Sequence, residues 1–86
     1  MNLTGRQRKT LDAVFAHPTR VNIRWADIER LLAAVDAEIS EGAGSRVRIK
    51  LGDQVKTFHR PHPGTQAKRY AVEAVRVFLK DHGITP

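Results

Sequence analysis

Apolar residues near the N-terminus recur at the spacing of a helix and stop before a proline. This stripe consists of Leu11, Val14 and Phe15. Thr4 and Gln7 precede it at the spacing of a capping box, in which each side chain bonds a backbone N–H of the first turn. Pro18 disfavours helical geometry at His17. We therefore predict a first helix from about Thr4 to about His17.

Longer apolar stripes predict two further helices. The first of these spans Trp25–Val35, and its stripe consists of Trp25, Ile28, Leu31, Leu32 and Val35. The last helix begins at Thr65 or Gln66 and ends at about His82. Its stripe consists of Tyr70, Ala71, Ala74, Val75, Phe78 and Leu79. Gly83 fits the left-handed residue that follows a helix. We expect both stripes to lie in the core.

Between these two helices the pattern changes to that of strands. Residues 37–41 predict a first strand, and residues 46–51 a second one with strict alternation. Its apolar face carries Val47, Ile49 and Leu51, and its polar face carries Arg46, Arg48 and Lys50.

A two-residue turn at Gly52-Asp53 leads to a third strand, residues 54–60. This turn predicts four cross-strand pairs: Leu51 with Gln54, Arg48 with Thr57, Val47 with Phe58, and Arg46 with His59. A slip of one residue would move Phe58 into solvent, which disfavours it. Pro61-His62-Pro63-Gly64 then forms a rigid break.

The order of elements predicts an α+β fold. Three antiparallel strands form a sheet that carries the helices on one face, and the other face stays open. On the predicted register this open face is basic and presents Arg46, Arg48, Lys50, Thr57 and His59. With 86 residues the chain is expected to form a single domain.

Charge and composition limit which partners and which kinds of site are possible. Fifteen Lys and Arg against nine Asp and Glu give a formal charge of +6, which favours a polyanion or an acidic protein as the partner. The absence of cysteine excludes disulfide scaffolds, thiolate metal sites and cysteine nucleophiles. No apolar run is long enough for a membrane span or a signal peptide, so we expect a cytoplasmic protein.

His59 and His62 flank Arg60-Pro61 beside the cationic strands. An imidazole can take the proton of an RNA 2′-hydroxyl while guanidinium groups stabilise charge on the phosphate. We therefore predict His59 and His62 as catalytic residues. Contacts to RNA phosphates are predicted for Arg46, Arg48, Lys50 and Arg60. The His-x-x-His spacing has no third ligand nearby, so we expect no metal. We also expect no cofactor, because the RNA hydroxyl is itself the nucleophile. From residue types alone, a non-catalytic basic face is the alternative.

Four segments between Trp25 and Ile84 carry a family resemblance. They are Asp27-Ile28-Glu29-Arg30-Leu31-Leu32, Gly44-Ser45-Arg46, Phe58-His59-Arg60-Pro61-His62-Pro63 and Phe78-Leu79-Lys80-Asp81-His82-Gly83-Ile84. In this order and spacing they resemble the HicA toxin family, small RNA-cleaving toxins of type II toxin–antitoxin systems. The resemblance implies a double-stranded-RNA-binding-domain-like fold over residues 23–86, preceded by a helical extension, residues 1–22.

The resemblance also implies a mechanism and a partner. It implies an mRNA interferase that a HicB-type antitoxin holds inactive. The catalytic histidine of the family follows a Gly-Ser pair, whereas Arg46 follows Gly44-Ser45 in this chain. His62 matches a histidine often found in the family after the third strand. We hypothesise that His59, the predicted neighbour of Arg46, is the general base, while Arg46 and Arg48 bind phosphate.

Three other functions stay open. The chain fits a HicA-like RNA-binding module without catalysis, because Arg46 replaces the expected histidine. It also fits a basic protein–protein interaction domain that binds an acidic partner. DNA binding through a winged helix is less supported, because the Trp25–Val35 helix offers Arg30 as its one basic group.

Overall fold

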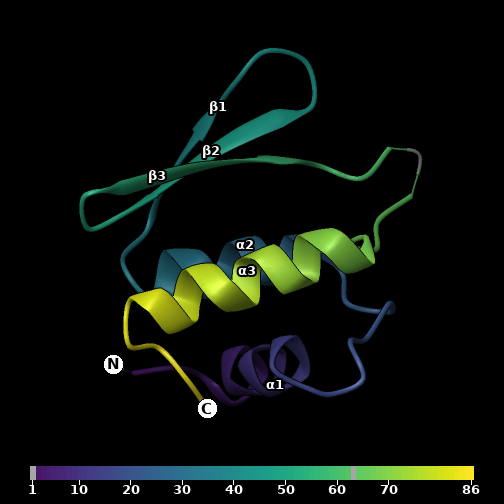
Figure 1. The fold of residues 1–86 in the computed structure, drawn as a ribbon, viewed down its shortest axis with the longest axis vertical. Helices are drawn as coiled ribbons and strands as arrows, with labels where there is room; N and C mark the ends of the chain where they lie inside the picture. Colours follow the sequence, from purple (N-terminus) through teal and green to yellow (C-terminus); the bar gives the residue numbers. More distant parts are fainter. Residues whose placement is uncertain (1, 63) are drawn as a thin grey trace.

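The computed structural model describes residues 2–62 and 64–86 of the chain. Its elements are α1 (Gly5–Val14), α2 (Trp25–Ala34), β1 (Glu38–Glu41), β2 (Arg46–Leu51), β3 (Gln54–His59) and α3 (Arg69–Asp81). Their order, two helices, three strands and a helix, is the predicted one (Figure 1). Pro63, which belongs to the predicted break after the third strand, lies outside the described residues.

The elements are stacked in layers (Figure 1). The antiparallel sheet, in the order β1-β2-β3, lies on one side of α2 and α3, and α1 packs on the side of these helices that faces away from it. The helices therefore cover one face of the sheet and leave the other open, which confirms the predicted α+β fold. The predicted division into residues 1–22 and 23–86 stays a prediction.

A single apolar core joins the sheet to the three helices. Its largest fully buried side chains are Leu11, Val14, Ile28, Leu31, Leu32, Val47, Ile49, Val72, Val75, Phe78 and Leu79. Trp25 is also buried, with 4% of its surface exposed, and its ring lies 5.8 Å from that of Phe58. The predicted place of Trp25 in the core is confirmed.

The predicted register of the β2–β3 hairpin is confirmed. Arg46 pairs with His59, and Val47 pairs with Phe58. The two-residue turn and the alternation act together here, because the register that the turn sets also puts every large apolar side chain of β2 on the helical side. The hairpin thus fixes which side chains reach the open face.

Two predicted helix ends are confirmed in detail. Thr4 Oγ1 accepts from the N–H of Gln7 at 3.2 Å, and the Gln7 side chain accepts from the N–H of Thr4 at 3.0 Å. Gly83, after α3, has a positive φ of 73°, which glycine adopts without steric cost. The N–H of Ile84 then bonds the carbonyl of Leu79 at 3.0 Å, which satisfies a free acceptor at the end of the helix.

The predicted start of the last helix is wrong. Residues 65–67 are extended and pair with residues 23–25: the Trp25 N–H bonds the Thr65 carbonyl at 2.8 Å, and the Ala67 N–H bonds the Ile23 carbonyl at 2.7 Å. Because these long-range bonds occupy the backbone groups, the helix begins only at Arg69.

Tyr70 does not belong to the core stripe of the last helix, contrary to the prediction. Val72 is fully buried, whereas 59% of the Tyr70 surface is exposed. The buried stripe is centred on the Ala71–Val72 side of α3, so Tyr70 lies at its edge.

The ends of the two N-terminal helices also differ slightly from the prediction. α1 ends at Val14 rather than His17, and α2 ends one residue before Val35.

Candidate functional site

A shallow pocket of about 450 Å³ lies where β3 leaves the sheet and α3 begins. Its lining residues are Ser45, His59, Arg60, Pro61, His62, Lys68, Tyr70 and Ala71. The pocket brings together His59 and His62, the two histidines predicted as catalytic. Both are solvent-exposed, so a bound polymer can reach them from outside.

The hairpin positions His59 at the edge of this pocket. His59 is the last residue of β3 and pairs with Arg46, the first residue of β2. The neighbouring pair is hydrogen-bonded, since the Arg60 N–H donates to the Ser45 carbonyl at 2.9 Å. Arg46 and His59 therefore form a non-hydrogen-bonded pair, in which the Cα atoms approach to about 4.5 Å and the side chains lie closest. An imidazole and a guanidinium thus share one end of the open face.

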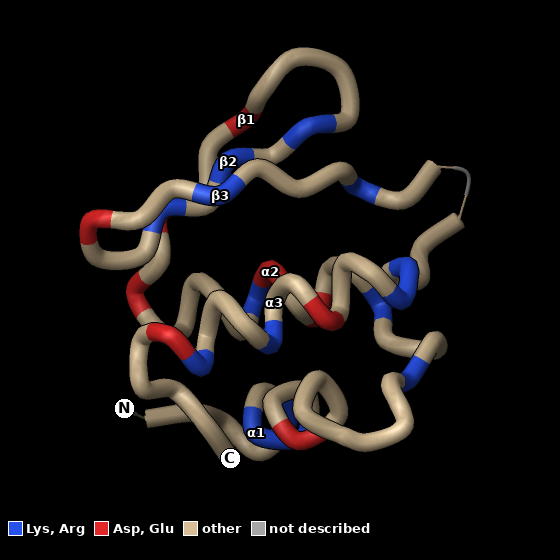
Figure 2. The backbone as a smooth tube through the Cα atoms, in the orientation of Figure 1, with Lys and Arg blue, Asp and Glu red and all other residues tan. Residues whose placement is uncertain are grey.

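Three cations line the open face of β2, at alternate positions of the strand. Arg46, Arg48 and Lys50 are exposed, and within the described residues none of them forms an ion pair. Figure 2 shows Lys and Arg along β2 and β3. One acidic residue, Glu38, shares this face as the cross-strand partner of Lys50. The open face therefore has a net positive charge, and its cations are available to bind an anion.

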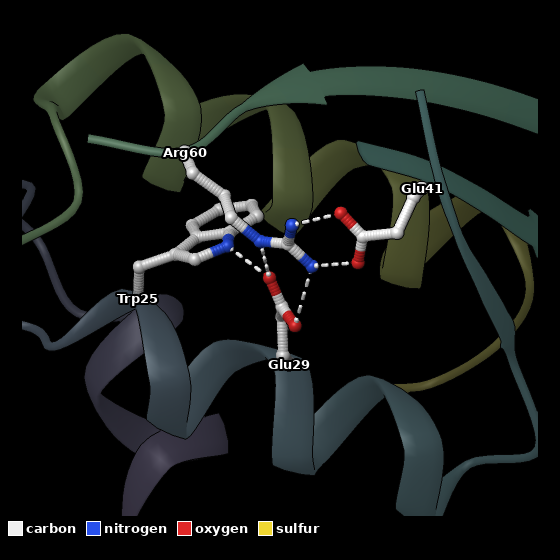
Figure 3. A network of polar contacts seen from close by, with 4 residues as sticks. All are labelled: Trp25, Glu29, Glu41 and Arg60. Atoms are coloured by element: carbon white, nitrogen blue, oxygen red, sulfur yellow. Dashed lines mark hydrogen bonds and ion pairs between the residues drawn. The ribbon is translucent and has the colours of Figure 1, made fainter. Parts of the chain in front are cut away.

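The Arg60 side chain lies among carboxylates from α2 and β1 (Figure 3). Its Nε donates to Glu29 at 2.8 Å and its Nη2 to the other Glu29 oxygen at 3.3 Å. Nη1 and Nη2 donate to the two oxygens of Glu41 at 2.6 and 3.0 Å. The indole N–H of Trp25 also donates to Glu29. Four hydrogen bonds therefore engage a guanidinium that has five N–H donors.

The Arg60 network joins three parts of the fold and shifts the pKa of Glu41 and of Arg60. Glu29 belongs to α2, Glu41 to β1, and Arg60 directly follows β3. The hydrogen bonds from Arg60, followed by its charge, lower the pKa of Glu41. The hydrogen bonds with Glu41 and then Glu29 raise the pKa of Arg60. The network holds the end of β3, and with it His59, against α2 and β1.

Further residues of the site are not predicted from the sequence. Lys68 and Tyr70 line the pocket from the start of α3, and Ser45 lines it from the turn before β2. Tyr70 is assigned to the core by its spacing alone. The one local sign of the Arg60 network is the four-residue spacing of Trp25 and Glu29, which puts both side chains on one face of α2.

Neither a membrane-spanning helix nor a metal-binding cluster is found in the part of the chain that the structure describes. No helix there has the length and apolar character that crossing a membrane requires. Nor does any group of three or more His, Asp or Glu side chains there come together as a metal ion would require.

A family model matches most of the chain. The model describes the HicA toxin of bacterial toxin–antitoxin systems, and it matches residues 25–84, from the start of α2 to just past α3. No curated protein and no solved structure matches the chain. Because the match covers well over half of the 86 residues, the chain belongs to the HicA toxin family.

Proposed function

We propose that this HicA-family toxin binds RNA on the open face of its sheet and cleaves it at the pocket lined by His59 and His62. Family membership makes the protein a toxin of a toxin–antitoxin system and implies an antitoxin partner. The observation that carries the cleavage proposal is that two exposed imidazoles line one pocket next to β2, whose cations Arg46, Arg48 and Lys50 form no ion pair within the described residues. We expect the toxin to meet its substrate, mRNA, in the cytoplasm.

The two imidazoles divide the proton transfers of the reaction. The neutral imidazole of His59 takes the proton from a ribose 2′-hydroxyl, and the 2′-oxygen forms a bond to the adjacent phosphorus. The bond from phosphorus to the 5′-oxygen breaks, and protonated His62 gives that oxygen its proton. The products are a 2′,3′-cyclic phosphate and a 5′-hydroxyl. Since the RNA supplies the nucleophile, no metal or cofactor is needed.

The cations supply binding and charge stabilisation. In this proposal Arg46, the cross-strand neighbour of His59, contacts the phosphate under attack, where negative charge develops in the transition state. Arg48 and Lys50 continue the positive surface along β2 and bind the phosphates that follow. Arg60 is a positioning residue, because its donors are directed to Glu29 and Glu41.

Two residues at the start of α3 complete the site. Lys68 adds a cation to the lining of the pocket, and the exposed ring of Tyr70 offers a surface on which a base can stack. Such stacking is tolerant of sequence, because every base has a flat face.

The chemistry of the products tests this proposal. Purified protein is incubated with an RNA and with a DNA of the same sequence, with and without a chelator. We expect cleavage of the RNA alone, at an unchanged rate with chelator, and fragments that end in 2′,3′-cyclic phosphate and 5′-hydroxyl. Cleavage of the DNA, or 5′-phosphate ends, would contradict the proposed mechanism.

One observation favours a second function. Arg46 stands where the family's catalytic histidine is expected, and this suits a HicA-like module that binds RNA without cutting it. If the purified protein binds RNA with a steep salt dependence and leaves it intact, this second function is correct.

A further inference from the structure

A second basic surface lies on the far side of the helices from the sheet. A groove of about 1000 Å³ runs between α1 and the segment that connects it to α2. Its cationic lining residues are Arg6, Arg8, Lys9, Arg20 and Arg24. Figure 2 shows Lys and Arg on α1 and on the connecting segment. We call this hollow the α1 groove.

The positive charges of the α1 groove exceed its negative charges. Two carboxylates line it, those of Asp12 and Asp27. Asp27 is already engaged, by Arg30 at 3.0 Å and by Arg6 at 3.6 Å. Arg8 and Arg20 are exposed, and neither forms an ion pair within the described residues. The groove therefore presents free cations to a ligand.

The cations on α1 do not stabilise its helix dipole. The first turn of α1 holds no acidic residue, while Arg6, Arg8 and Lys9 lie near the helix N-terminus, where the backbone dipole is already positive. Acidic residues would be the stabilising choice at these positions. α1 also precedes the residues that match the family model, so the groove is largely an addition to the family core.

A smaller hollow shares lining residues with both the α1 groove and the histidine pocket. This hollow has a volume of about 220 Å³ and lies at the start of α2. It shares Arg24 with the α1 groove and shares Arg60 and Pro61 with the histidine pocket. Arg24, Trp25 and Thr65, from the two segments that pair here, are among its lining residues. The three hollows are thus linked in series by shared lining residues.

We propose that the α1 groove binds the phosphates of the same RNA strand that enters the histidine pocket. This inference rests on the proposed function, because it extends the substrate site described above. A single-stranded RNA fits the observations better than an acidic peptide, since a polymer held at the pocket continues along the shared hollow to reach the free cations. The α1 groove then binds several nucleotides on one side of the cleaved bond.

The test compares long and short RNA on two charge-matched variants. The groove variant combines Arg8→Gln with Arg20→Gln, and the control combines Lys56→Gln with Lys80→Gln, whose residues line none of the three hollows. The probes are 2′-O-methyl RNAs of about 16 and about 4 nucleotides, which bind without being cut. Thermal unfolding is recorded for both variants.

For the long RNA we expect the groove variant to bind about tenfold more weakly than the control. The plot of log binding constant against log salt concentration should also be shallower by about 1.4, because each of the two lost phosphate contacts removes about 0.7 from its slope. Binding of the short RNA stays equal in the two variants. If the groove variant binds the long RNA as the control does, or loses the short RNA equally, the inference is wrong. Polyglutamate serves as a third probe. If the groove variant loses polyglutamate binding but keeps RNA binding, the inference is also wrong, and the groove is assigned to an acidic protein.

The same experiment separates this inference from the proposed function. If unmodified protein binds neither RNA, the proposed function fails and the inference fails with it. If unmodified protein binds both RNAs and the groove variant matches the control, the inference alone fails.

Discussion

Arg46 and His59 face each other across β2 and β3 on the open side of the sheet, as a cross-strand pair. The resemblance to the HicA family places a catalytic histidine at the position that Arg46 occupies. In this chain an imidazole is therefore present one strand away from the expected position. Because side chains of such a pair lie close together, the catalytic group and the phosphate-binding group can exchange strands while the site keeps both chemistries.

The exchange predicts rescue by a second substitution. His59→Ala removes the proposed general base, and adding Arg46→His returns an imidazole to the facing position of β2. We expect the double variant to recover part of the cleavage rate that His59→Ala loses, at least tenfold above the single variant in single-turnover assays. Arg46→Gln in the same background is the control and gives no recovery. Equal rates for the two double variants would contradict the exchange.

The Arg60 network predicts unequal couplings in double-mutant cycles. Side-chain exposure is 31% for Arg60 and 22% for Glu29, whereas Glu41 is 71% exposed. We expect a coupling free energy of about 1–2 kcal/mol between Arg60 and Glu29, because both side chains are largely shielded from water and their attraction is therefore weakly screened. The Arg60–Glu41 coupling is smaller, because water screens the Glu41 carboxylate. Urea unfolding of Arg60→Gln, Glu29→Gln, Glu41→Gln and the double variants measures both, and a larger coupling to Glu41 would contradict this account.

The same network predicts a loss of stability in acid. Arg60 lowers the pKa of Glu41 from its ordinary value of 4.5 in the folded state. A carboxylate with a lowered folded pKa stabilises the fold fully above its unfolded pKa, and this contribution disappears as pH falls through the folded value. The difference in Tm between the native protein and Glu41→Gln should therefore be largest at neutral pH and shrink below pH 4.5. A difference that stays constant or grows in acid would exclude the Arg60 contact as its source.

The open face of β2 predicts competition between the substrate and the antitoxin. We expect an acidic segment of the antitoxin to cover Arg46, Arg48 and Lys50, because these cations are exposed and unpaired among the described residues. Arg48→Glu should weaken the binding of RNA and of antitoxin, the latter by tenfold or more at low salt. Val77→Glu, on the exposed side of α3, changes charge without touching this face and serves as the control. Unchanged antitoxin affinity in Arg48→Glu would place the antitoxin elsewhere.

The hairpin and its open face are predictable from the sequence because local rules determine them. Gly52 and Asp53 set the turn, and the alternation of β2 decides which face is buried, so the pairing of Arg46 with His59 follows without knowledge of distant residues. The capping box of α1 and the left-handed Gly83 are equally local.

The remaining features depend on contacts between distant residues. Arg60 meets Glu29 across 31 positions and Glu41 across 19 positions, and a strand pattern carries no sign of either partner. The start of α3 is set by backbone bonds between residues 65–67 and 23–25, which hold an apparent first turn in an extended form. That shift brings Tyr70 and Lys68 to the pocket, so these residues could be assigned only once the fold was known.

The cleavage rate of His59→Ala tests the central proposal most directly. Single-turnover rates are measured for the native protein, His59→Ala, His62→Ala and the distant control Lys80→Gln, with RNA affinity determined in parallel. We expect His59→Ala to lose about 10²- to 10⁴-fold in rate while it binds RNA nearly as well as the control. A rate for His59→Ala equal to that of Lys80→Gln would contradict the assignment of His59 as the general base.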